Sequence, residues 1–428
     1  MRTRSQWSLL TVLVTMLAAP AMVDAQGGGE TTIEELVTRA LADNPDLRAG
    51  RAEVDAATAR VRQAALRPNP MLDLGGQKAL GPDNNLNIGV TVPLDLNGRQ
   101  RGRVGVAERE LEAKRAQVTD RERRLAADVR MKAGELLAAR RNLSFTDELL
   151  NVNREGLRIV QDRVRLGGAP PFEESLLLVE VNRLDAGREL LTSRLAIAAL
   201  QLRALAGLAP EAPLALQGDL TPAPLPIDRA MAVTQAVNSR ADVAMSRAEI
   251  EIARARVRKE EAEGRWDASV NIGYQRQDFG YDLRGLTATG ATRPIQDVFH
   301  YFGGGVTITL PLRNRNQGNV AAAVADTRAA EQRQEFVRLT IGQEVQSAFA
   351  QHDAARRSLE IYERGVRDVA RRNLEVVRKT YELGRTSVLE VVAEQRRYIE
   401  IETGYTDSLR QLYDAAVEVR RAVGFVDR

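Results

Sequence analysis

The sequence predicts a mixed α and β protein that consists mostly of long α-helical coiled-coil hairpins, with four strands set between them. Three observations support this fold class. Only 4% of the 428 residues are aromatic while 28% are charged, a composition typical of long helices. Apolar residues recur every seven positions through long segments that contain no proline. The order of these features also occurs twice along the chain, as in proteins built from internal repeats.

The first 25 residues have the pattern of a secretory signal peptide. Arg2 and Arg4 supply the positive start, residues 7–17 an apolar segment, and residues 23–25 a small-residue cleavage site. The apolar segment is shorter than the roughly 20 residues that span a bilayer, which disfavours a membrane anchor. We therefore expect an exported protein whose mature chain begins at Gln26.

Charge and cysteine content narrow the function classes. The formal net charge is +3, and loss of the signal peptide, with two arginines and one aspartate, would leave it at +2. Such a near balance argues for neither nucleic acid nor an acidic partner, so we expect no nucleic-acid partner. Cysteine is absent, so we expect no disulfide, no thiolate metal site and no lipid on an N-terminal cysteine. No later segment is apolar enough for a spanning helix, so membrane contact would require a closed barrel.

The two halves of the chain follow one pattern. A Leu-Gly turn at Gly167 has its counterpart 217 positions later, at Gly384. In each half an alternating segment leads to a proline, a short polar stretch and then the long helical segment. A short amphipathic helix opens each half, the first with a capping box formed by Thr32 and Glu35 and the second with Asp228 as a plausible cap. The expected division is a first repeat at 26–208 (strands about 70–96, hairpin about 99–207), a proline-rich linker at 209–226, and a second repeat at 227–428 (strands about 266–312, hairpin about 317–424).

A seven-residue period runs through both hairpins. It predicts left-handed coiled coils whose seams contain these residues. The outgoing helices carry the period at Met131, Ala138, Phe145, Val152, Ile159 and Leu166, and at Ala348, Ala355, Tyr362, Val369, Val376 and Leu383; the return helices carry it at Leu177, Leu184, Leu191, Ala198 and Leu205, and at Val391, Tyr398, Tyr405, Leu412 and Val419. The first outgoing segment extends without a break from about residue 99 to 166, on the order of 100 Å of helix.

Four segments, at 72–77, 86–94, 266–275 and 302–312, alternate between apolar residues and polar residues or glycine. Strands of roughly 9 to 11 residues with one polar face match a tilted membrane strand beside a water-filled lumen. A half-buried sheet in a soluble domain would show the same alternation; the export signal favours the membrane. Because about eight strands make the smallest known barrel, we expect a barrel shared between copies, eight-stranded in a dimer or twelve-stranded in a trimer. Residues 78–85 and 278–298 are predicted to be outward-facing loops between neighbouring strands.

The chain resembles the TolC-type outer-membrane factor (outer membrane efflux protein) family. Segments 67–70 (RPNP), 93–99 (PLDLNGR) and 310–318 (LPLRNRNQG) are similar to its CzcC-like branch, which serves tripartite heavy-metal efflux pumps. The resemblance implies a homotrimer with one 12-stranded β-barrel, four strands per protomer, on an α-helical periplasmic barrel. It also implies the outer membrane of a Gram-negative bacterium, with outer-membrane lipid, a periplasmic adaptor (membrane fusion) protein and an inner-membrane pump as partners.

The sequence therefore predicts the outer-membrane channel of a tripartite efflux pump, a passive exit duct for divalent heavy-metal cations. Two alternatives are open: a duct of the same family for drugs or secreted polypeptides, and a periplasmic structural coiled-coil adaptor. We expect no enzyme, catalytic residue, cofactor or resident metal. His300 and His352 lie about fifty residues apart, without the three or four clustered ligands of a zinc site, and the methionines are isolated.

The candidate functional residues lie at the reversals of the two hairpins and on one helix beside them. Glycine at a helix C-terminus is expected on structural grounds, but an exposed leucine beside it favours a docking contact. The predicted adaptor-docking tips are Leu166, Gly167 and Gly168, and Leu383, Gly384, Arg385, Thr386 and Ser387. Because Pro170 and Pro171 occupy the positions of Ser387 and Val388, the two tips should make unequal contacts. A periplasmic gate is predicted at Asp368, Arg371, Arg372 and Glu375; a solvated helix face is the alternative.

Overall fold

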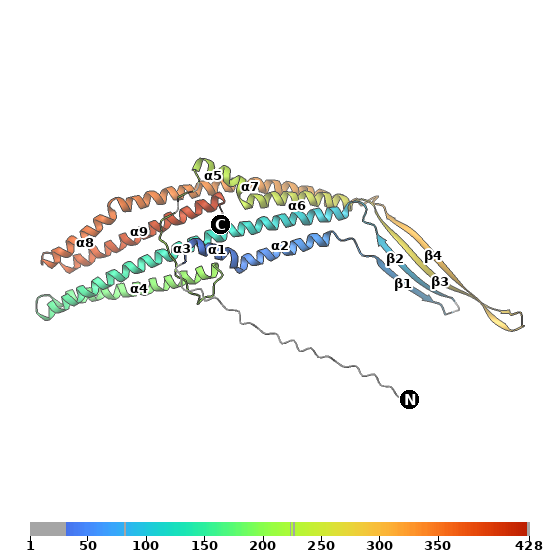
Figure 1. The fold of residues 1–428 in the computed structure, drawn as a ribbon, viewed down its shortest axis with the longest axis horizontal. Helices are drawn as coiled ribbons and strands as arrows, with labels where there is room; N and C mark the ends of the chain where they lie inside the picture. Colours follow the sequence, from blue (N-terminus) through green and yellow to red (C-terminus); the bar gives the residue numbers. More distant parts are fainter. Residues whose placement is uncertain (1–30, 81–82, 223, 226, 426–428) are drawn as a thin grey trace, which may run out of the picture.

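The computed structural model describes residues 31–80, 83–222, 224–225 and 227–425. The predicted signal peptide and Gln26 lie outside the described residues. Figure 1 shows an elongated molecule in which long helical hairpins extend from one end and a small sheet forms the other.

Both halves follow the order helix, helix, strand, strand and long helical hairpin. The first half contains α1 (Ile33–Asp43), α2 (Pro45–Ala64), β1 (Met71–Lys78), β2 (Asn84–Pro93), α3 (Arg99–Arg165) and α4 (Pro171–Leu205). The second contains α5 (Arg229–Ser239), α6 (Ala241–Glu263), β3 (Asp267–Leu286), β4 (Thr292–Thr309), α7 (Gln317–Ile361), a π-helical turn η1 (Tyr362–Val366), α8 (Arg367–Glu382) and α9 (Val388–Val423). None of the helices in the described residues holds a stretch apolar enough to cross a membrane.

Each half opens with two helices rather than the single helix expected. The predicted capping box is present, with the Thr32 hydroxyl accepting from the Glu35 backbone N–H and the Glu35 side chain accepting in return. Pro45 then ends α1, because proline has no N–H for the helix ladder and is tolerated only at a helix start. The break between α5 and α6 is at Arg240, whose backbone is extended. Asp228 occupies the N-cap position of α5 but makes no capping hydrogen bond with its side chain.

The four strands form one antiparallel sheet in the order β1-β2-β3-β4. The register pairs Val90 with Ile272, and Val270 with Val306. Even-numbered residues therefore share one face on all four strands, and odd-numbered residues share the other. The even-numbered face is apolar over most of the sheet, while the odd-numbered face carries asparagine, threonine and glycine, including the paired Gly273. The predicted alternation is thus continuous from strand to strand.

The second predicted loop is wrong for most of its length. Instead of a loop at 278–298, β3 continues to Leu286 and β4 begins at Thr292. A short turn joins them, in which the Thr287 N–H donates to the Ala291 carbonyl at 2.8 Å. Beyond Asp278, where β2 ends its pairing with β3, the extra residues of β3 and β4 pair with each other, and the Gly280 N–H also donates to the Asp83 carboxylate. Glycine and proline suggested a loop, but a ribbon with free edges tolerates both. The first predicted loop, 78–85, is shorter than expected, because β1 includes Lys78 and β2 starts at Asn84.

The proline-rich linker packs against the helices. Leu216 and Leu220 are 4% and 5% exposed and join the core cluster formed by α1, α3, the end of α4 and α9. A backbone bridge ties Leu216 to Thr31, the first described residue. Burial of these side chains fixes the path of the linker, because removal of their apolar surface from water is favourable.

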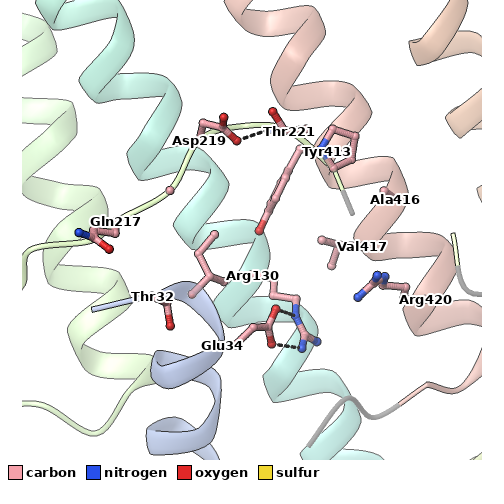
Figure 2. A pocket seen from close by; sticks show the side chains of 13 residues that line it. Thr32, Glu34, Arg130, Gln217, Asp219, Thr221, Tyr413, Ala416, Val417 and Arg420 are labelled. Atoms are coloured by element: carbon pink, nitrogen blue, oxygen red, sulfur yellow. Dashed lines mark hydrogen bonds and ion pairs between the residues drawn. The ribbon is translucent and has the colours of Figure 1, made fainter. Parts of the chain in front are cut away.

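A cavity of about 380 Å³ lies where the linker meets α1, α3 and α9. Figure 2 shows Arg130 of α3 turned toward Glu34 of α1, 2.6 Å away. The Asp219 carboxylate accepts from the Thr221 backbone N–H at 2.9 Å. Both contacts join residues of this chain. The cavity therefore lies at a junction where several of the chain's own structural elements meet.

The seven-residue period is confirmed on the return helices and is wrong along part of the outgoing ones. Leu177 and Leu184 are buried in α4, as are Leu412 and Val419 in α9. In α3, however, Val152 and Ile159 are 48% and 55% exposed. The buried residues nearby are instead Leu150, Asn153, Leu157 and Val160. A straight helix drifts by about 20° per heptad, which turns residues seven apart away from the seam over this length.

A π-helical turn displaces the seam between α7 and α8. The segment Tyr362–Val366 interrupts what the sequence predicts as one helix. Such a turn inserts an extra residue into the helical repeat. Past it, Val369 and Val376 are 45% and 61% exposed, and Ala370 and Leu374 are buried instead. The predicted seam is therefore wrong beyond Tyr362.

Candidate functional site

The two hairpin ends have the same backbone geometry. Gly167 has a φ of +72° and Gly384 a φ of +70°, the left-handed conformation that glycine adopts without steric cost. At the first end the N–H of Gly167 donates to Val164 and that of Gly168 to Arg163. At the second end Gly384 donates to Tyr381 and Arg385 to Thr380. These paired bonds are the Schellman motif, which satisfies carbonyls left free at a helix C-terminus.

Both ends expose apolar side chains beside this turn. Leu166 is 82% exposed and Leu383 is 72% exposed. A second such pair lies just outside the predicted turn residues, at the start of each return helix. Phe172 and Leu389 also lie 217 positions apart and are 67% and 56% exposed. We refer to Leu166, Phe172, Leu383 and Leu389 as the tip patch. Figure 1 shows both hairpin ends at the extremity opposite the sheet.

The two ends differ at the start of their return helices. The Ser387 hydroxyl accepts from the Glu390 backbone N–H and caps α9, while the Thr386 hydroxyl donates to the Glu390 carboxylate. Pro170 holds the equivalent place before α4, where no side chain caps the helix. The second end is therefore tied to its helix by side-chain hydrogen bonds that the first end lacks.

Two polar contacts join the hairpins close to their ends. The Tyr381 hydroxyl of α8 donates to the Glu173 carboxylate of α4 at 2.7 Å. The Arg163 guanidinium lies 5.8 Å from the centre of the Tyr381 ring, within cation–π range. Burial, with the hydrogen bond to Glu173 as a further cause, raises the pKa of Tyr381 to about 12. The phenol therefore stays protonated and keeps donating at neutral pH.

The second contact is a buried carboxylate between α4 and α9. The Glu180 side chain has no exposed surface, and it accepts hydrogen bonds from Arg183 of its own helix and from Arg396 of α9, the latter at 3.0 Å. Burial opposes ionisation of Glu180, but the hydrogen bonds from both arginines outweigh it and lower the pKa of this carboxyl. Glu180 is thus a charged link between the hairpins at neutral pH. We call the Tyr381–Glu173 and Arg396–Glu180 contacts the inter-hairpin latch.

An apolar cluster lies around the latch. Val388 and Val392, in the first turns of α9, are 3% exposed and pack with buried residues of α3 and α4. Its remaining buried members are Leu150, Leu157, Val160, Leu177, Val181 and Leu184. Exclusion of water strengthens a hydrogen bond between charged groups. The cluster and the latch together hold the end of the second hairpin against the first.

The four predicted gate residues lie on one exposed face of α8. Asp368, Arg371, Arg372 and Glu375 follow the spacing of a single helix face, and the Asp368 and Arg371 side chains are 3.7 Å apart. The opposite face carries the buried Leu374 and packs on α9. The charges are therefore not paired with the first hairpin, unlike the latch residues.

The two histidines lie far from the tips and from each other along the fold. His300 is in β4, where its Nδ1 is 2.7 Å from the Tyr274 hydroxyl. His352 is in α7, with its Nδ1 3.8 Å from Asp353. Among the described residues, no group of three or more histidine, cysteine, aspartate or glutamate side chains is placed to hold a metal ion.

Comparison with known proteins agrees with this architecture. The sequence profile described as outer membrane efflux protein matches residues 36–208 and 232–425. The cobalt-zinc-cadmium resistance protein CzcC of Cupriavidus metallidurans is 25% identical over 399 residues, covering 93% of this chain and 91% of the relative. The nickel-cobalt-cadmium resistance protein NccC of Alcaligenes xylosoxydans xylosoxydans is 27% identical over 325 residues, 74% of this chain and 69% of the relative.

The fold also matches that of solved structures. A membrane protein from Pseudomonas aeruginosa superposes with a TM-score of 0.75 at 21% identity, over 92% of this chain and 90% of that one. The family match covers both halves of the chain, and it excludes the alternative of a periplasmic coiled-coil adaptor. The chain therefore belongs to the outer membrane efflux protein family, and it is an outer-membrane efflux channel rather than an enzyme.

Proposed function

We propose that the chain is the exit duct of a tripartite efflux pump for divalent heavy-metal cations, and that it works as a homotrimer in the outer membrane of a Gram-negative bacterium. The observation that carries this proposal is the sheet, which has one apolar face and one polar face and whose outer strands, β1 and β4, have no partner within the described chain. Lipid would contact the even-numbered face, and water would fill the lumen on the odd-numbered face.

The free strand edges support assembly between copies. An unpaired strand edge presents backbone groups that need hydrogen-bond partners, most of all in lipid. Pairing of β4 with β1 of the next copy would close a barrel without free edges. Three copies would supply twelve strands. The long helices would then extend from the barrel into the periplasm, with the tip patch and the α8 charges at the far end.

The similarity to two metal-resistance proteins favours metal cations as cargo. CzcC and NccC carry cobalt, zinc, cadmium and nickel resistance in their names, and the match to CzcC covers 93% of this chain. Since no metal-binding cluster occurs among the described residues, ions would pass through the duct without being held by clustered ligands. An adaptor would dock on the tip patch, and an inner-membrane pump would supply the driving force.

The purified protein is expected to be a trimer in detergent. Four strands are too few to close a barrel, so a folded monomer would leave strand edges exposed. Light scattering with correction for bound detergent measures the protein mass of the particle. A monomer or dimer that keeps its full strand signal in circular dichroism would contradict the trimeric barrel.

Deletion of the gene is expected to sensitise cells to cobalt, zinc, cadmium and nickel much more than to hydrophobic drugs. The duct is the last step of export, so its loss should raise the cellular content of its cargo. Growth inhibition and cell-associated metal measure the effect, with re-expression of the chain as the control. Equal sensitisation to drugs would favour the alternative duct for drugs or polypeptides.

A further inference from the structure

Most of the large apolar side chains change faces about halfway along the β3–β4 ribbon. Up to Tyr274 and Phe302, the large apolar residues lie on the even-numbered face. Beyond that level the even-numbered face carries Arg276 and Asp278, whose side chains are 3.0 Å apart. Most of the large apolar residues with a paired position are now odd-numbered, namely Phe279, Tyr281, Ile295, Phe299 and Tyr301, while Val298 and Leu286 stay on the even-numbered face. Patterning for lipid contact does not explain this reversal, because the pleat places odd-numbered residues on the opposite side.

Three of the aromatic rings on the odd-numbered face contact one another. The Phe279 and Phe299 ring centres are 5.8 Å apart, and those of Phe299 and Tyr301 are 6.4 Å apart. The side chains are nevertheless 39%, 43% and 47% exposed, in the order Phe279, Phe299, Tyr301. We call these three residues the aromatic collar. Their stacked and edge-to-face contacts favour an ordered group of rings.

The side chains on the odd-numbered face are much smaller one odd-numbered residue pair nearer the helices. Tyr301 pairs with Gln275, and the next odd-numbered pair is Gly303 with Gly273. A Cβ at Gly303 would meet no atom within 4 Å. Over two residues along β4, the odd-numbered face therefore changes from glycine without a side chain to large aromatic rings.

The level of the collar can be placed from the opposite face. Tyr274, His300 and Phe302 form an aromatic group there, with the Tyr274 hydroxyl 2.7 Å from His300 Nδ1. Aromatic residues with polar ends gather where the apolar layer of a membrane meets water. The charges of Arg276 and Asp278 lie on the far side of this group, in keeping with water or headgroups at that level. The collar thus lies at the outer rim, at the level where β2 ends its pairing with β3, and the rest of the β3–β4 ribbon extends beyond it.

We propose that the aromatic collar is the constriction at the outer mouth of the duct, where three copies turn Phe279, Phe299 and Tyr301 toward a common axis. This inference rests on the proposed trimeric duct. Nine rings from three protomers narrow a lumen that is otherwise lined mostly by glycine and small or medium-sized polar side chains. Small hydrated cations pass, while bulky solutes in the medium are excluded. The collar therefore limits the size of the solutes that enter the duct from the medium.

The experiment compares two adjacent residues that face opposite ways. Because the chain contains no cysteine, Tyr301→Cys and Phe302→Cys each introduce a single thiol per protomer. The trimers are reconstituted in planar bilayers and treated with a charged, membrane-impermeant methanethiosulfonate. Tyr301→Cys is expected to lose most of its conductance after modification, and Phe302→Cys to keep it. The double variant Phe299→Ala/Tyr301→Ala is expected to conduct more than the unmodified chain and to admit larger polyethylene glycols.

The outcomes separate this inference from the function on which it rests. If the unmodified chain forms no conducting trimer, the proposed duct fails and the collar fails with it. If it conducts, but modified Tyr301→Cys and the double alanine variant both conduct like the unmodified chain, the duct stands and the collar is overturned. Block of Phe302→Cys in place of Tyr301→Cys would also overturn it, because the lumen would then lie on the even-numbered face. Trimer mass in detergent confirms that each variant has assembled.

Discussion

Replacement of Leu383 by aspartate is expected to abolish efflux while the trimer stays assembled and inserted. Leu383 is 72% exposed at the end of a rigid hairpin, so the change should alter folding stability by less than about 0.5 kcal/mol, as is usual for surface sites. An adaptor docked on the tip patch, however, would have to bury an unpaired carboxylate, which is costly. Metal resistance in a complemented deletion strain and crosslinking to the adaptor measure the two effects.

A conservative change at the same position provides the control. Leu383→Met keeps the apolar surface and should restore resistance. Leu166→Asp tests the other end, and a weaker defect there is expected if the two tips make unequal contacts. Normal resistance in Leu383→Asp, with the adaptor still crosslinked to the turn, would show that docking occurs elsewhere.

Gly384 allows the backbone of the same tip to be tested separately. A valine would have to adopt a φ near the +70° of Gly384, at a cost of about 1–2 kcal/mol for an L-residue in this region. Asparagine tolerates this conformation better. We expect Gly384→Val to lose efflux and Gly384→Asn to keep most of it. Loss of efflux in both variants would mean that any side chain added at this position interferes, whatever the conformation of the turn.

Removal of the inter-hairpin latch is expected to increase the conductance of the reconstituted channel several-fold. The double variant Arg396→Ala/Tyr381→Phe eliminates the donors to Glu180 and to Glu173. The hydrogen bond between Arg183 and Glu180 within α4 stays in place, so Glu180 retains a partner. With these links lost, the end of the α8–α9 hairpin should move away from α4 and widen the entrance. Single-channel recording in planar bilayers measures the change.

The control removes the other partner of the same carboxylate. Arg183→Ala takes away a bond within α4 but leaves the contact of Glu180 with Arg396, so conductance should stay close to that of the unmodified chain. The opposite pattern, an open Arg183→Ala channel and an unchanged double variant, would rule out the latch as the restraint on the entrance. Detergent-corrected mass again establishes that both variants assemble.

The pH dependence of the latch follows from the direction of the pKa shift. Because the pKa of Glu180 is lowered in the folded protein, its stabilising contribution is complete above the ordinary value of 4.5 and is lost as the pH falls through the lowered pKa. Conductance limited by the Glu180 contact should therefore be constant through the neutral range. It should rise only in more acidic solution.

The sequence by itself determined the features that depend on local pattern. The two repeats, the alternating strand faces and the glycine turns at Gly167 and Gly384 are all present in the structure. Each is encoded within a few residues, because side-chain period follows from backbone geometry and a left-handed φ favours glycine. The exposed leucines beside both turns were predicted from their place at the helix reversals.

Only the tertiary structure decided which residues meet across long distances. Residues Glu180 and Arg396 belong to different repeats, and neither stands out among the many charged residues of the long helices. The π-helical turn that places Leu374 rather than Val376 in the seam likewise leaves no clear mark in the pattern. The length of the β3–β4 ribbon depends on pairing between these two strands beyond the end of β2. Because of this pairing, Phe279 of the collar lies in a strand rather than in the predicted loop. Local periodicity states which face of an element is apolar, but the neighbour that covers it is selected by the packing of whole helices and strands.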